Sequence, residues 1–285
     1  MVAVLYNVFK IRIGLAIAIT AVAGFAVTPG RVVTPLDVFF LALAVLGASA
    51  AAGAFNHLVE RDLDARMQRT RARPFVTGKF SADWRWGLGI FTLLTVSVGL
   101  AWWATNPVAA LYVYLGAIVY GYVYTVLLKR RTVWNIVIGG LAGSFAVLAG
   151  AAAADPTPGP LPLALAATLF LWTPPHFWSL AMALRDDYAR AGVPMLPVVL
   201  GNGPAARVIF AHTLVLVAVS MTPLVLGFGW LYGAFAFTGG AVFIYTSWKL
   251  TLNPETTTAM RNFHASLLQL VLILIGCMIE GFSFV

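Results

Sequence analysis

Residues 56–74 read NHLVERDLDARMQRTRARP and carry three carboxylates and five arginines, in a chain of which only 10% of residues are charged. Asn56, Glu60 and Asp64 recur every four residues, so on a helix their side chains form one polar row. Acids that follow an apolar segment at a membrane surface are costly unless a cation pairs with them. The stretch therefore predicts a divalent metal ion that carries a phosphorylated ligand, with the arginines contacting the same phosphate oxygens. The alternative is a solvated helix end with exposed ion pairs.

The rest of the chain is strongly apolar, with 61% hydrophobic residues among 285. Apolar stretches of about 20 residues, each long enough to cross a ~30 Å hydrocarbon layer, recur along it. We therefore expect an all-α polytopic membrane protein that forms a single domain over residues 1–285. Nine transmembrane helices are expected, at about 11–29, 36–60, 85–105, 107–127, 132–153, 161–184, 206–226, 228–248 and 262–282.

The distribution of basic residues predicts how the chain crosses the membrane. All lysines and arginines except Arg31 fall before the first span or in the connections on the same side as it. By the positive-inside rule the N-terminus is cytoplasmic and the C-terminus lies outside, in the inner (plasma) membrane of the cell. The connections at about 61–85 and 185–206 then form cytoplasmic cap loops. The net charge of +8 is accordingly a topology signal, so we expect the lipid bilayer and no nucleic acid as a partner.

A second polar group lies near residues 173–188, which contain TPPHFW and then RDDY. Two consecutive prolines inside an apolar span are expected to interrupt its hydrogen-bond ladder. His176 is either a structural hydrogen-bonding residue or, beside Trp178, a contact for a porphyrin. Asp186 and Asp187 end a helix on the same face as the first acidic stretch, so the two acidic segments are able to converge there.

A third polar segment, YGYVYTVLLKRRT at 120–132, ends another span on that face. It is either an interfacial tyrosine belt with a basic anchor or a phosphate site that uses Lys129 and Arg130. The spacing alone does not decide between the two. The four histidines show no paired metal spacing, and His212 and His264 receive no role.

Three segments, at 56–78, 124–143 and 173–199, resemble the protohaem IX farnesyltransferases (haem O synthases) of the UbiA prenyltransferase superfamily. The PPHFW motif and the DYxxAGxPMLP block that begins at Asp187 are typical of the haem branch. The resemblance implies a UbiA-type fold, with nine transmembrane helices around a central cavity open to the cytoplasmic side. It implies a magnesium-dependent transfer of farnesyl from farnesyl diphosphate to a vinyl group of protohaem IX (haem B), with addition of water to give haem O. A downstream haem A synthase or terminal oxidase is a further expected partner.

The residues and the resemblance together predict three groups of site residues. Catalytic roles are expected for Asn56, Glu60, Asp62, Asp64, Asp186 and Asp187, and Mg2+ ligation for Asn56, Glu60, Asp64 and Asp187. Diphosphate binding is expected for Arg66, Arg69, Arg73, Tyr124, Lys129, Arg130 and Arg185, and haem binding for His57, His176 and Trp178. Two positions depart from the family pattern. Glu60 stands where the family usually has Asp, and Ser144-Phe145 stands where a Pro-Pro pair commonly follows Gly143.

The sequence also permits other functions. The same chemistry on a different aromatic or tetrapyrrole acceptor, such as a quinone precursor or chlorophyllide, is the nearest alternative. A secondary transporter would explain a broken helix, but no second broken helix stands at a matching place in another half. A haem carrier without catalysis would leave the acidic stretch unexplained.

Overall fold

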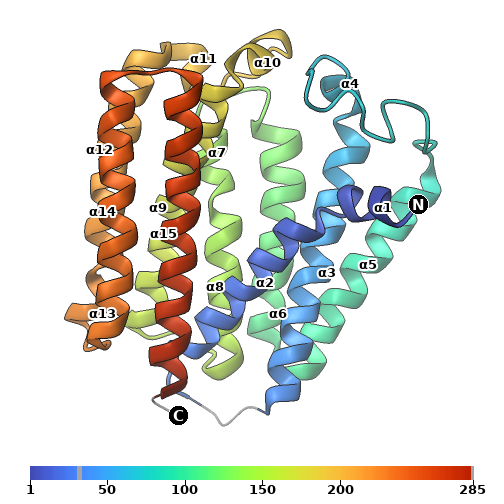
Figure 1. The fold of residues 1–285 in the computed structure, drawn as a ribbon. Helices are drawn as coiled ribbons and strands as arrows, with labels where there is room; N and C mark the ends of the chain where they lie inside the picture. Colours follow the sequence, from blue (N-terminus) through green and yellow to red (C-terminus); the bar gives the residue numbers. More distant parts are fainter. Residues whose placement is uncertain (31–33, 284–285) are drawn as a thin grey trace.

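Helices make up most of the protein in the computed structural model, which describes residues 1–30 and 34–283. The long helices lie side by side in one bundle (Figure 1). In chain order the elements are α1 (Val2–Val8), α2 (Ile11–Ala26), α3 (Pro35–Val59), α4 (Arg61–Asp64), α5 (Trp84–Ala104), α6 (Pro107–Ile118), the π-helix η1 (Val119–Leu128), α7 (Asn135–Gly139), α8 (Leu141–Ala154), α9 (Pro160–Ala183), α10 (Arg185–Arg190), α11 (Leu196–Leu200), α12 (Asn202–Ser220), α13 (Thr222–Val225), α14 (Trp230–Leu252) and α15 (Thr256–Ser283). No strand occurs in the described ranges.

Each segment expected to cross the membrane contains a helix of the bundle, with α15 beginning at Thr256, earlier than expected. Over residues 1–30 and 34–283, six helices are long and apolar enough to span a membrane, or seven if the bent pair α1–α2 is one span. Helices α9 and α14 are not among them, because proline, tryptophan and hydroxyl side chains lower their mean hydropathy. An integral membrane bundle is thus established, and the count of nine spans stays a prediction.

Local sequence explains where several helices begin. Thr34 caps α3 through a capping box with Asp37, and Pro35 follows at the first helical position. Asn106 caps α6 through its side-chain oxygen, which accepts from the N–H groups of Val108 and Ala109, each at 3.0 Å. These caps satisfy backbone donors that would otherwise be unpaired at the ends of apolar helices.

Helix α2 approaches α8 very closely, through small residues. A Cβ atom placed on Gly150 would lie 1.7 Å from the backbone oxygen of Ala21, and one on Gly24 would lie 2.2 Å from that of Val147. Only glycine permits such a close approach. In a membrane, lipid offers the same apolar contact as a neighbouring helix, so close packing through small residues is what favours helix association. Substitution of either glycine would push the two helices apart.

The prolines in α9 remove two bonds from its hydrogen-bond ladder, because proline has no backbone N–H, but they do not end the helix. Pro174 and Pro175 lie inside a continuous helix from Pro160 to Ala183. Pro175 cannot donate to the carbonyl of Leu171 one turn earlier, and the imidazole of His212 on α12 hydrogen-bonds that carbonyl instead. His212 therefore has a structural role, because it supplies a donor from another helix to a carbonyl that the proline leaves unpaired.

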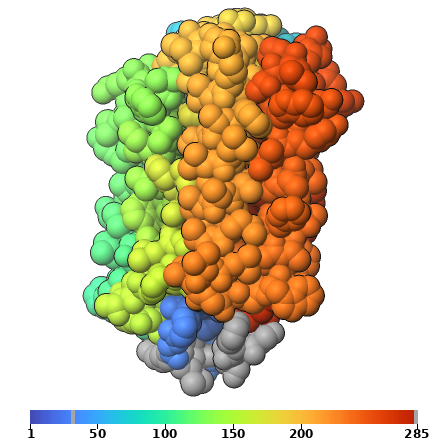
Figure 2. Space-filling view, turned by 90° about the vertical axis from the view of Figure 1, so that its left-hand side faces the viewer, coloured from blue at the N-terminus to red at the C-terminus, as the bar shows by residue number. Residues whose placement is uncertain are grey.

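The short elements α4, α10 and α11 all lie at one end of the bundle (Figure 1). The segments expected to form the cap loops therefore share an end. Figure 2 views the side on which α12 and α14 lie. These two helices expose large apolar side chains, among them Val215, Phe237 and Trp248, as a lipid-facing surface requires. Arg31, the one basic residue expected on the opposite side, lies outside the described residues.

Candidate active site

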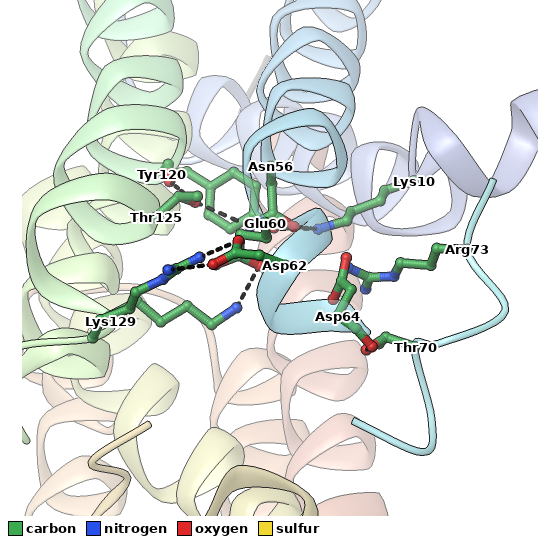
Figure 3. Close-up of polar contacts among 11 residues, drawn as sticks. Lys10, Asn56, Glu60, Asp62, Asp64, Thr70, Arg73, Tyr120, Thr125 and Lys129 are labelled. Atoms are coloured by element: carbon green, nitrogen blue, oxygen red, sulfur yellow. Dashed lines mark hydrogen bonds and ion pairs between the residues drawn. The ribbon is translucent and has the colours of Figure 1, made fainter. Parts of the chain in front are cut away.

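The end of α3 and the short helix α4 place the polar row at the boundary between the bundle and its cap. Asn56 lies in the last turns of α3, Glu60 follows directly after that helix, and Asp64 ends α4. All three side chains are buried. Glutamate and aspartate side chains are rarely buried in water-soluble proteins unless they are paired. Figure 3 shows the row with its cationic neighbours from three other segments of the chain.

Glu60 forms a buried ion pair with Lys129, which follows η1. The Lys129 Nζ lies 2.6 Å from Glu60 Oε2, with side-chain exposures of 11% and 1%. Burial lowers the pKa of Lys129, and the Glu60 carboxylate beside it opposes that shift. The second oxygen, Glu60 Oε1, is buried and has no hydrogen-bond partner among the described residues. One carboxylate lone pair at the centre of the site is therefore free for a cationic ligand.

Asp64 pairs with Arg73 from the stretch that follows α4. Arg73 Nη1 lies 2.8 Å from Oδ1 and 2.6 Å from Oδ2 of the carboxylate, whose exposure is only 2%. The Thr70 hydroxyl donates to the backbone oxygen of Asp64 at 3.1 Å and folds this stretch back onto α4. An arginine from the cap thus closes over the second buried acid (Figure 3).

Asn56 contacts Lys10, whose charge in the sequence indicated only the membrane topology. The Lys10 Nζ donates to Asn56 Oδ1 at 2.6 Å and to the Tyr120 hydroxyl at 2.7 Å. Lys10 stands at the 54° bend between α1 and α2 and has a left-handed backbone, with φ of +49°. Such a conformation costs free energy at a residue other than glycine, so the contacts of the side chain must help to hold it.

The π-helix η1 supplies the wall opposite α3. Its wide turns join residues five apart, as where the Lys129 N–H donates to the Tyr124 oxygen at 2.9 Å. Thr125 accepts a hydrogen bond from Asn56, and Lys129, four residues later, pairs with Glu60, four residues after Asn56. The Tyr120 and Tyr124 rings stack at 5.8 Å, with Lys10 and Lys129 within cation–π range of one ring each. π-helical turns are frequent at functional sites.

Asp62 lies on the outer side of α4 and pairs with Arg130 in a bidentate bridge of 2.7 and 2.8 Å. Both side chains are exposed, at 53% and 42%. The hydrogen bond from Arg130 lowers the pKa of Asp62. The pair therefore ties α4 to the end of η1 from the solvent side, without being enclosed with Glu60 and Asp64.

The second acidic segment meets the first through Asp187 on α10. Its carboxylate accepts from the backbone N–H groups of Gln68 and Arg69, each at 3.1 Å, and pairs with Arg190. Burial raises the pKa of the Asp187 carboxyl, but these N–H groups and Arg190 outweigh burial and hold that pKa below its usual value. The neighbouring Tyr188 is buried against Leu63 and Met67. Two segments about 120 residues apart therefore dock onto each other above the buried acids.

Other expected site residues lie on the periphery. Asp186 is exposed on α10, as are Arg66 and Arg69 on the stretch after α4. Arg185 donates through Nε to the backbone oxygen of Pro197 at 3.0 Å, which fixes the connection to α11. Neither Arg66 nor Asp186 forms an ion pair with another described residue. The structure thus places Arg73 and Lys129 in the buried cluster but leaves these others at its rim.

The three residues expected to bind haem lie in different surroundings. His57 is buried on α3, within electrostatic range of Lys10, Arg73 and Lys129, and its Nδ1 has no described partner. His176 lies between α9 and α15, where its Nδ1 is 2.7 Å from the Ser266 hydroxyl. Trp178 turns toward α12 and meets His212 edge-on at 5.7 Å. His176 and Trp178 therefore face different helices.

The chemistry of the buried row fits a magnesium ion that is held jointly with a diphosphate. Over residues 1–30 and 34–283, no three His, Cys, Asp or Glu side chains are grouped to hold a metal by themselves. Mg2+ is commonly bound by one or two carboxylates together with substrate phosphates. The unpartnered Glu60 Oε1 and the surrounding lysine and arginine side chains match that need.

An all-helical membrane bundle with buried acids and cations at one end is the arrangement expected of an intramembrane prenyltransferase of the UbiA type. The chain belongs to this family, because the model described as the UbiA prenyltransferase family matches residues 17–273. The chain is 58% identical over 277 residues to protoheme IX farnesyltransferase 2 of Paramagnetospirillum magneticum, covering 97% of this chain and 96% of that protein. The family resemblance of the three sequence segments is confirmed.

Solved structures show the same fold. A digeranylgeranylglyceryl phosphate synthase superposes with a TM-score of 0.80 at 17% identity, covering 99% of both chains. A UbiA homologue from Archaeoglobus fulgidus, bound to DMAPP and Mg2+, superposes with a TM-score of 0.72 at 17% identity, covering 94% of this chain and 98% of that one. The UbiA-type architecture that the sequence predicts is therefore confirmed.

Proposed function

We propose that this protein transfers a farnesyl group from farnesyl diphosphate to a vinyl group of protohaem IX and that addition of water yields haem O. The observation that carries this proposal is the 58% identity, over 97% of the chain, to a protein named protoheme IX farnesyltransferase. The site residues support it, since the buried row and its cations suit a diphosphate. The proposal includes nine spans around a central cavity that opens to the cytoplasm, with the N-terminus cytoplasmic and the C-terminus outside.

The donor binds with its diphosphate at the polar row and its apolar chain among the spans. Lys129, Arg73 and Lys10 are the cations nearest the buried oxygens, so they attract and orient the diphosphate. Arg69, Arg130 and the other rim arginines extend the positive charge outward. Neutralising the charge that builds on the leaving diphosphate contributes several kcal/mol to lowering the barrier.

Asn56, Glu60 and Asp64 are the residues that would hold Mg2+, with Asp187 completing the set from α10. The support is the free Glu60 oxygen and the Mg2+ in the structure of the Archaeoglobus homologue. When bound, the ion supplies positive charge to the diphosphate oxygens as the carbon–oxygen bond breaks. Asp187 acts in addition through structure, because it anchors the stretch that carries Arg69 and Arg73.

Breaking the bond between C1 of the farnesyl group and the diphosphate oxygen leaves an allylic cation. The stacked Tyr120 and Tyr124 rings next to the row present π-electrons to that cation, at about 0.5–2 kcal/mol for each favourable contact. The cation forms a carbon–carbon bond with the terminal carbon of a haem vinyl group. Water then adds to the adjacent carbon and releases a proton. Apolar spans must exclude water from the allylic cation until coupling has occurred.

The acceptor side of the site contains His176 on α9, and the haem O product would pass to a haem A synthase or a terminal oxidase. The whole proposal is tested by incubating the purified protein with farnesyl diphosphate, haem B and Mg2+ and analysing the porphyrin by mass spectrometry. The expected product carries one farnesyl group and one water. An unmodified porphyrin, or a prenylated acceptor of another class in a parallel incubation, would refute the proposal.

A further inference from the structure

The imidazole of His176 is held on three sides by side chains of α9 and α15. It stacks on Trp172 with ring centroids 4.0 Å apart and on Phe263 with centroids 4.5 Å apart, at interplanar angles of 20° and 26°. Its Nδ1 lies 2.7 Å from the Ser266 hydroxyl oxygen. Because both faces are covered and one nitrogen is engaged, only the edge that carries Nε2 remains for another ligand.

Ser266 decides which nitrogen carries the proton in the neutral imidazole. Its hydroxyl donates to the backbone oxygen of Phe263 at 2.6 Å, a bond that serines inside helices commonly form. A hydroxyl has one hydrogen, so toward His176 the Ser266 oxygen can only accept. In the arrangement that forms both bonds, the donor is His176 Nδ1–H and Nε2 keeps its lone pair.

Further contacts keep this arrangement in place. The Trp172 indole Nε1 donates to the Ser266 backbone oxygen at 2.8 Å, so residue 266 holds both the imidazole and the ring stacked on it. His176 Nε2 has no hydrogen-bond partner among the described residues, and it is not among the atoms that are both buried and unpartnered. None of the described ion pairs involves α9 or α15.

We infer that His176 Nε2 is an axial ligand of the porphyrin iron and that Ser266 is the residue that positions it. The inference rests on the proposed function, in which haem is the acceptor. A neutral histidine nitrogen is a common axial ligand of haem, and a hydrogen bond at the other nitrogen fixes the tautomer and orientation of the ring. Anchoring the iron on α9 defines the position of the porphyrin, so that only rotation about the iron–nitrogen bond remains to bring a vinyl group to the donor.

The test titrates haem B into the purified full-length protein in detergent without farnesyl diphosphate and follows absorption and resonance Raman spectra. We expect the wild type to show a histidine-ligated iron. Ser266→Ala should weaken haem binding about 10–100-fold, the usual effect of losing such a supporting hydrogen bond. Ser266→Thr, which keeps the hydroxyl, should restore most of the affinity. His176→Gly should lose the spectral signature and regain it when free imidazole is added.

Ser220→Ala is the matched control. Ser220 is also a fully buried helix serine, donates to a backbone oxygen three residues earlier, and has a backbone oxygen that accepts from an aromatic side chain, Tyr232. Its loss should leave haem affinity and spectrum unchanged. Metal-free protoporphyrin IX, which offers no iron, should bind wild type and Ser266→Ala equally.

The outcomes separate this inference from the proposed function. If the wild type binds haem but neither His176→Gly nor Ser266→Ala changes its spectrum or affinity, the iron ligand is wrong and the transferase proposal stands. Equal weakening for haem and for metal-free protoporphyrin would show that the histidine only packs against the macrocycle, which also overturns the inference. A wild type that binds no haem would overturn both.

Discussion

In the α3–α4–η1 region the buried carboxylates pair with lysine and arginine, whereas between α9 and α15 the buried polar side chains are neutral and bond to one another. The first region contains the pairs Glu60–Lys129 and Asp64–Arg73. In the second, Asn262 donates to Ser179 at 2.9 Å and accepts from Ser247 at 2.9 Å. The same bundle therefore stabilises two polar layers by different means.

The difference indicates what each region is able to bind. A site built from acids and cations exchanges its internal ion pairs for those of a charged ligand such as a metal diphosphate. A neutral network makes no strong demand for charge and fits the flat apolar face of a porphyrin ring. If the two regions have these separate roles, substitutions in one should leave the other unaffected.

The largest effect should follow from removing one partner of the buried charged pair. Lys129→Met leaves the Glu60 carboxylate uncompensated, and we expect a loss of about 3–5 kcal/mol of stability. Thermal unfolding of the purified protein in detergent measures it. The double variant Glu60→Gln/Lys129→Met, which removes both charges, should be much closer to wild type. A single variant as stable as wild type would contradict the buried-pair account.

The next effect concerns catalysis at the same row. Asp64→Asn keeps the shape of the side chain but removes its charge, and we expect the rate of haem O formation to fall about 10²–10³-fold. The rate is measured by chromatography of the porphyrin products. Asp155→Asn, in the exposed loop that follows α8, is the control and should retain full activity. An unimpaired Asp64→Asn would remove this residue from the proposed metal site.

A smaller effect links the metal to the donor. Because each buried acid already carries an ion pair within the chain, Mg2+ and the diphosphate should each bind better in the presence of the other. We expect farnesyl diphosphate to bind about 5–150-fold more tightly with Mg2+ than with a chelator, the usual range of coupling between sites. Equilibrium binding of labelled farnesyl diphosphate tests this. Haem affinity should not change between the two conditions, and a parallel change would argue against separate regions.

The smallest effect is expected at the solvent-exposed pair. Asp62→Asn removes the salt bridge to Arg130. Both side chains of that bridge are largely exposed. Exposed pairs typically contribute about 0–1 kcal/mol, so thermal unfolding should shift little. A loss as large as that of Lys129→Met would show that the distinction between enclosed and exposed acids is not valid.

Much of the architecture was predictable because it depends on local properties of the chain. The length of each apolar run located the long helices, and the four-residue spacing placed Asn56, Glu60 and Asp64 on one face of a helical segment. The pairing partners were not predictable in this way. Nothing in the spacing separates Arg73, which meets Asp64, from Arg66 or Arg71, which lie on the same stretch.

The prolines of α9 and the role of Lys10 escaped prediction for the same physical reason. The carbonyl that Pro175 leaves without a donor in α9 finds one on another helix, at His212, and no local pattern marks that partner. Lys10 precedes Asn56 by 46 residues, and only the bend between α1 and α2 turns its side chain toward that amide. Asp187 likewise finds its partners in backbone N–H groups, which every residue but proline has and no sequence motif marks.

The amino-acid sequence by itself determined that this is a helical membrane protein with an acidic row at a helix end and a second acidic segment on the same face. Hydropathy and helical periodicity act over a few residues, so they can be read from the chain. The tertiary structure alone decided that the row is enclosed by Lys10, Arg73 and Lys129 and that Ser266 orients His176. Such pairings depend on distances between segments far apart in sequence, and only the packed bundle sets these distances.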